Sequence, residues 1–128
     1  NHSTFYCSRG LVQMNLNSAK DAIRDYTVAL TINRNDAYAH FLLASAYSNP
    51  DDPLHTNSIE AVEHAEIAAR LTQYRNAQYV MGLARALRVA HSYDKAVAAA
   101  KKAIELDPRD DYKKELSQFE RLMAERSR

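Results

Sequence analysis

A stripe of alanines along one helical stretch constrains the fold of this chain more than any other feature of its sequence. Ala96, Ala100 and Ala103 follow one another at steps of four and three residues, which places them on one face of an α-helix. Ser92 is a favourable N-cap before this stretch, and Pro108 after it cannot continue a helix. Small side chains let a neighbouring helix approach closely, near the short end of the usual separation of about 8–10 Å. The stretch is therefore predicted to be a helix packed tightly between neighbours.

The same pattern occurs twice earlier in the chain. The equivalent residues are Ala22, Tyr26 and Ala29 in the first copy, and Ala61, Ala65 and Ala68 in the second. Each copy follows another apolar helical stretch that has a small residue at an equivalent point, namely Gly10, Ala44 or Ala84. The copies recur at a period of about 34 to 35 residues, with an insertion of roughly five residues in the middle copy. Three helix pairs in tandem predict an all-α fold.

At these positions the chain resembles the tetratricopeptide repeat family, whose helix–turn–helix unit is 34 residues long. The resemblance covers about residues 3–110. The third copy is the most similar and has the family's signature residues Leu83, Ala84, Ala96, Ala103 and Pro108. The first two copies depart from the pattern at their ends, because Arg34 and Gln73 stand where the terminal proline is expected.

The resemblance implies an all-α superhelix of about seven helices that forms a single domain over residues 1–128. The repeats are expected at about residues 3–36, 37–76 and 77–110, followed by a capping helix at about 110–126. This last stretch is amphipathic, as expected of a helix that closes the open end of a stack. The segment 49–57 contains two prolines and two aspartates, and it is predicted to be an exposed, mobile loop.

No group of residues in the sequence indicates catalysis, a metal site or a cofactor. The five histidines lack the spacing of zinc ligands, and Gly10 and Gly82 are isolated within helical stretches instead of forming a phosphate loop. His40 is expected to be a hydrogen-bonded core residue, and Cys7 a small buried hydrophobic residue. A formal net charge of +1 predicts no general attraction to nucleic acid or to anionic membranes. The chain is therefore predicted not to be an enzyme, and to use neither a metal nor a cofactor.

In the family, the first helix of each repeat lines an inner face that holds an extended peptide or a partner's helix. Transferred to this sequence, the resemblance implies a peptide-binding groove lined by Thr4, Cys7, Leu11, Met14, Tyr38, Phe41, Ser45, Ser48, Gln78, Met81, Arg85 and Arg88. Such a groove is apolar at one end and cationic at the other, where an acidic group of the ligand is expected beside Arg85 and Arg88. One subclass of the family holds the carboxylate tails of heat-shock chaperones through lysine, asparagine and arginine. Here Cys7, Leu11 and Leu42 occupy lysine and asparagine places, so this clamp is predicted to be missing.

The predicted function is that of a protein–protein interaction module that binds a peptide or helix in this groove. The partner is then a protein or peptide, and neither nucleic acid nor membrane is expected. The alternative is a structural role, as a scaffold segment of a longer superhelix or as a self-association domain. Apolar side chains are expected to supply most of the affinity, so that Phe41→Ala weakens binding more than Arg85→Ala does.

Overall fold

The computed structural model describes residues 2–127, and within that range it contains seven α-helices and no strand. The helices are α1 (His2–Asn15), α2 (Ala19–Ile32), α3 (Ala37–Tyr47), α4 (Ser58–Leu71), α5 (Ala77–Val89), α6 (Tyr93–Leu106) and α7 (Asp110–Arg126). The prediction of an all-α chain with about seven helices is confirmed.

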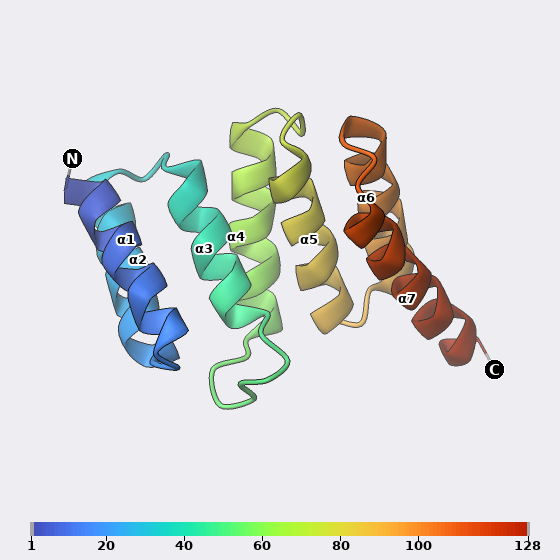
Figure 1. Cartoon of the computed structure of the whole chain (residues 1–128), viewed down its shortest axis with the longest axis horizontal. Helices are drawn as coiled ribbons and strands as arrows, with labels where there is room; N and C mark the ends of the chain where they lie inside the picture. The colour runs from blue at the N-terminus through green and yellow to red at the C-terminus, as the bar shows by residue number, and fades with distance from the viewer. Residues whose placement is uncertain (1, 128) are drawn as a thin grey trace.

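The helices stand in a row of antiparallel pairs, with the two ends of the chain at opposite ends of the row (Figure 1). Helix α1 pairs with α2, α3 with α4, and α5 with α6. Neighbouring pairs join through contacts of α2 with α3 and of α4 with α5, while α7 packs on α6. In the view of Figure 1, α1 lies in front of α2 and α7 lies in front of α6. Additional contacts of α3 with α1 and with α5 make these three helices one continuous inner face.

Side chains and left-handed residues set the helix ends. Three helices begin at a residue whose side-chain oxygen accepts a hydrogen bond from the backbone N–H three positions later: Asp36 before α3, Asn57 before α4 and Asn76 before α5. Asn17 adopts a φ of 60° after α1, as its place at the end of that helix predicts. Ser92 lies at the N-cap position of α6, as predicted, but its side chain makes no capping hydrogen bond.

The alanine stripes form the contacts between helices. Ala96, Ala100 and Ala103 are fully buried, whereas Lys102 is exposed. The prediction that these alanines are buried is confirmed, and Ala61 on α4 is buried as well. Because alanine offers little apolar area, the larger buried side chains, such as Tyr26 and Phe119, contribute most of the hydrophobic stabilisation per residue.

The insertion between α3 and α4 is exposed but has hydrogen bonds of its own. Leu54, in the middle of this loop, is 91% exposed. The Thr56 hydroxyl donates to the carbonyls of Asn49 and Asp52, and the backbone N–H of Asn57 donates to the carbonyl of Tyr47. In Figure 1 the loop extends below the row of helices, beyond the ends of α3 and α4. Its exposure is as predicted, and its mobility stays a prediction.

Candidate functional site

The residues predicted to line the groove differ in how much of each side chain reaches the inner face. The exposed ones are Thr4, Tyr38, Ser45 and Gln78, and the half-buried ones are Leu11, Met14, Arg85 and Arg88. Four others are buried: Cys7, Phe41, Ser48 and Met81. A ligand on this face therefore meets a surface formed mainly by the exposed and the half-buried residues.

Three aromatic rings form the centre of this surface, and we call them the aromatic floor: Tyr38 and Phe41 of α3 and Tyr79 of α5. The rings of Tyr38 and Phe41 stack with their centroids 6.4 Å apart, and Phe41 meets Tyr79 at 5.1 Å. Tyr38 is 41% exposed and Tyr79 is half-buried, whereas Phe41 is 7% exposed. A Cβ on Gly82 would lie 2.9 Å from the ring of Phe41, so the absence of a side chain there lets this ring rest on α5. The floor joins two repeats and leaves Tyr38 as its exposed ring.

The sequence prediction did not include Tyr79. The transferred pattern selects one face of each first helix, and Tyr79 lies at the edge of that face on α5. It reaches the floor because Phe41 extends across from α3 to meet it. A large aromatic residue directly after Gln78 was the only signal in the sequence that could have identified it.

The four buried residues correct the predicted groove. Met81 is 0% exposed and packs in one cluster with Tyr112 and Phe119 of α7, so the capping helix covers it. Cys7 belongs to the core cluster that contains Tyr26. Ser48 is buried, and its hydroxyl donates to the backbone carbonyl four residues earlier.

Phe41 is also buried, as part of the core beneath the exposed ring of Tyr38. Its replacement by alanine is therefore expected to destabilise the fold. The prediction that Phe41→Ala weakens binding more than Arg85→Ala stays a prediction.

The cationic end of the groove is occupied by the protein's own carboxylate. Glu115 of α7 accepts hydrogen bonds of 2.8 and 2.7 Å from Nε and a terminal nitrogen of Arg85. These hydrogen bonds raise the pKa of Arg85 above its ordinary value, against the effect of burial. Arg85 thus already has a carboxylate partner within the chain, and the expectation that it meets an acidic group of the ligand stays a prediction. Among the described residues, Arg88 forms no ion pair within 4.0 Å and stays available on the inner face.

Cys7 is buried, and no histidine belongs to a metal-binding group in the described part of the chain. Burial, assisted by the charge of Asp36, raises the pKa of Cys7 to about 11, so its thiol stays protonated near neutral pH and is a poor nucleophile. Between residues 2 and 127, no three or more His, Cys, Asp or Glu side chains are placed to hold a metal ion. Over the same range, no helix is long and apolar enough to cross a membrane.

A pair of stacked histidines joins α3 to α4. The Nδ1 atoms of His40 and His64 lie 2.9 Å apart, and Nε2 of His40 is 2.8 Å from the carbonyl of Arg34. Since a carbonyl only accepts, His40 carries its proton on Nε2 and accepts from the Nδ1–H of His64 at its other nitrogen. His40 is thus a hydrogen-bonded core residue, as predicted. The pairing with His64 could not be predicted from the sequence, because the two residues are 24 positions apart in the chain.

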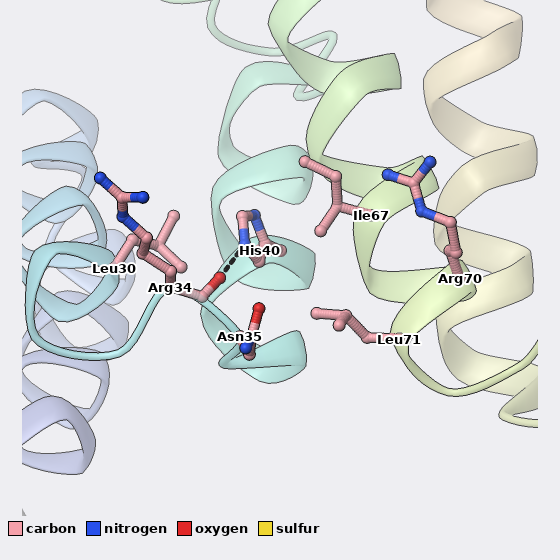
Figure 2. A pocket seen from close by; sticks show the side chains of 7 residues that line it. All are labelled: Leu30, Arg34, Asn35, His40, Ile67, Arg70 and Leu71. Carbon is pink, nitrogen blue, oxygen red and sulfur yellow. Dashed lines mark hydrogen bonds between the residues drawn. The ribbon is translucent and has the colours of Figure 1, made fainter.

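His40 also lines a cavity of about 470 Å³ between α2, α3 and α4. Its lining is Leu30, Arg34, Asn35, His40, Ile67, Arg70 and Leu71. Figure 2 shows Leu30 on one side, Ile67 and Leu71 on the other, and His40 bonded to the backbone of Arg34 between them. This cavity is distinct from the aromatic floor, with which it shares no residue.

Lowering the pH from 7 to 5 is expected to destabilise the fold through His64. Burial and the neighbouring His40 lower the pKa of His64, and they outweigh Glu60, whose carboxylate is 3.2 Å away, and Glu63. In the unfolded chain His64 binds a proton near pH 6.5, whereas in the folded chain it does so only at lower pH. The neutral form of His64 therefore stabilises the fold fully above pH 6.5, and this contribution is lost as the pH falls below 6.5. Thermal unfolding between pH 5 and 7 measures the effect. His64→Gln should flatten the profile relative to the wild type, and two parallel profiles would contradict the assignment.

Comparison with known proteins agrees with the arrangement of helices. A family model described as tetratricopeptide repeat matches residues 77–110. No curated protein has a sequence that matches this chain. The first tetratricopeptide repeat domain of human RPAP3 superposes with a TM-score of 0.86 and 16% identity, covering 98% of this chain and 95% of that one.

Two further solved structures are similar over most of their length. The tetratricopeptide repeat domain of Sgt2 from Aspergillus fumigatus has a TM-score of 0.83 and 25% identity, covering 98% of this chain and 81% of that one. The first such domain of Spaghetti (RPAP3), solved with the HSP90 peptide SRMEEVD, has a TM-score of 0.83 and 17% identity over 96% of each chain. One helix pair matches the repeat's family model and the whole chain has the fold of these domains. The chain thus contains a tetratricopeptide repeat at residues 77–110 and has the fold of tetratricopeptide repeat domains over nearly its whole length.

Proposed function

We propose that this chain is a protein–protein interaction module that binds an extended peptide or a helix of a partner protein on the inner face of α1, α3 and α5. The observation that carries the proposal is the exposed ring of Tyr38 above the buried Phe41, in the middle of that face. A tyrosine held in place by a stacked neighbour offers a large contact area at little cost in side-chain entropy, which is typical of residues that dominate binding. Leu11 and Met14 extend the apolar surface along α1.

The chemistry of the face favours an apolar or aromatic segment of the ligand over an acidic tail. The peptide bound to Spaghetti (RPAP3) ends in the acidic sequence EEVD, and a human RPAP3 domain is likewise solved with SGPTIEEVD. In this chain Arg85 is already neutralised by Glu115, and Leu11 stands at a place where the chaperone-binding subclass has a polar residue. We therefore expect an apolar ligand side chain on the aromatic floor, with at most one acidic group near Arg88.

Selection from a displayed peptide library, followed by calorimetry with the selected peptide, tests this proposal. Tyr38→Ala is expected to weaken binding about 10- to 100-fold, because exposed aromatic anchors contribute most of the affinity in such interfaces. Tyr74→Ala is the matched control, since Tyr74 is similarly exposed, at 37%, but lies in the turn between α4 and α5. Equal loss in both variants, or none in Tyr38→Ala, would contradict the proposed site.

A further inference from the structure

The outer side of α1 presents an apolar face that nothing in the described chain covers. Phe5 is 55% exposed, Val12 56% and Leu16 72%. Together with Arg9 they follow steps of four, three and four residues, which places them on one side of the helix. We call these four residues the N-terminal face. In Figure 1 α1 stands at one end of the row, with its neighbours α2 and α3 on its other sides.

The matching positions in the next two repeats are buried. Val12 lies two residues after Gly10, the small residue of the first helix. The residues two positions after Ala44 and Ala84 are Ala46 in α3 and Ala86 in α5, and both are almost completely buried. Leu43 and Leu83, each one residue before that small residue, are buried as well. In each case the covering surface is the second helix of the preceding pair, α2 or α4. Within the described residues, the N-terminal face is thus the same packing surface without a covering helix.

The opposite end of the stack is closed. Helix α7 turns Tyr112 and Phe119 inward, and its exposed side chains are mainly charged or polar. In repeat proteins such a polar outer face ends the stack and keeps it soluble. It therefore offers no apolar counterpart to the N-terminal face of a second molecule, which argues against head-to-tail association.

The charge at the centre of the N-terminal face is neutralised internally. Arg9 donates hydrogen bonds of 2.8 and 2.7 Å to the buried carboxylate of Asp25, and its guanidinium lies 5.4 Å from the ring centre of Phe5 and 5.2 Å from that of Tyr6. It is the only Asp, Glu, Lys or Arg residue in α1. Two copies of this face can therefore meet without repulsion between like charges.

We propose that two copies of this chain associate through their N-terminal faces, α1 against α1, around a two-fold axis. A two-fold interface uses the same patch on both molecules, so the patch must be self-complementary. A mostly apolar face whose one cation is already paired meets this requirement, and the polar end at α7 does not. Such a dimer would leave Tyr38 and the inner face of each copy for a ligand, and it does not depend on the proposed function.

Sedimentation equilibrium over a range of concentrations tests the proposal. The wild-type chain is expected to dimerise reversibly, and the double variant Val12→Glu, Leu16→Glu to raise the dissociation constant more than about 100-fold, because it brings like charges together in an apolar contact. Both side chains are exposed in the single molecule, so the helical circular dichroism signal should stay unchanged. Ile59→Glu on α4 is the matched control. Its side chain is 71% exposed, and the variant should dimerise like the wild type.

A charge-complementation experiment distinguishes this geometry from other dimers. Mixing the glutamate variant with the corresponding Val12→Lys, Leu16→Lys variant should restore a dimer containing one copy of each. A wild-type chain that stays monomeric overturns the proposal and leaves the N-terminal face to a further helix pair or to another protein. A dimer that the two variants leave intact, or that their mixture does not restore, overturns it as well.

Discussion

Replacing Phe119 with alanine is expected to lower the free energy of unfolding by about 3–5 kcal/mol, the usual cost of removing a fully buried phenylalanine side chain. Phe119 is 1% exposed and lies in the cluster that holds α7 against α5 and α6, together with Tyr112 and Met81. Removing its ring leaves a cavity under the capping helix. Urea unfolding monitored by circular dichroism measures the loss.

Met123→Ala is the control for this experiment, because Met123 lies on the same helix with 36% of its side chain exposed. It should change the free energy of unfolding by less than about 1 kcal/mol. If the two variants were equally stable, α7 would not be the cap that covers Met81. The sequence-based placement of Met81 in the groove would then regain support.

Replacing Gly10 with alanine is expected to cost about 1–3 kcal/mol, although alanine is the better helix former. A Cβ at this position would lie 2.4 Å from Cε1 and 2.8 Å from Cδ1 of Tyr26. Tyr26 is almost fully buried between α1, α2 and α3, so its ring has no space into which it can move. Urea titration of the variant measures the cost.

Gly82→Ala offers a matched comparison within α5. The new Cβ would lie 2.9 Å from the ring of Phe41, a milder contact, and the gain in helix propensity of about 1 kcal/mol offsets much of it. Gly82→Ala should therefore be close to neutral. A larger loss of stability for Gly82→Ala than for Gly10→Ala would show that the packing of Tyr26 does not determine how well α1 accepts an alanine at position 10.

The sequence predicted the helices and their packing because both depend on local spacing. Alanines at steps of three and four define a helix face by themselves, and their recurrence indicates which helices meet. Ala96 and Ala103 were accordingly predicted to be buried, and they are. The insertion was recognisable because Pro50 and Pro53 interrupt the same periodicity.

The groove was harder to predict because exposure depends on which elements lie above a helix face. The transferred pattern placed Met81 and Arg85 on the inner face of α5, which follows from helix geometry alone. It could not show that α7 covers Met81, nor that Glu115 is held within 2.7 Å of Arg85. The meeting of His40 with His64 was hidden for the same reason, since only the packing of α3 on α4 brings them together.

Amide chemical shifts in the NMR spectrum of the labelled chain, recorded while the selected peptide is added, test the central claim most directly. That claim is that the chain binds its partner on the inner face, over the aromatic floor. We expect the largest shifts at Leu11, Tyr38 and Gln78, with the backbone of α2, α4 and α6 almost unchanged. Shifts concentrated around Ile67 and Leu71, at the cavity of Figure 2, would instead place the ligand between α2 and α4 and contradict the account.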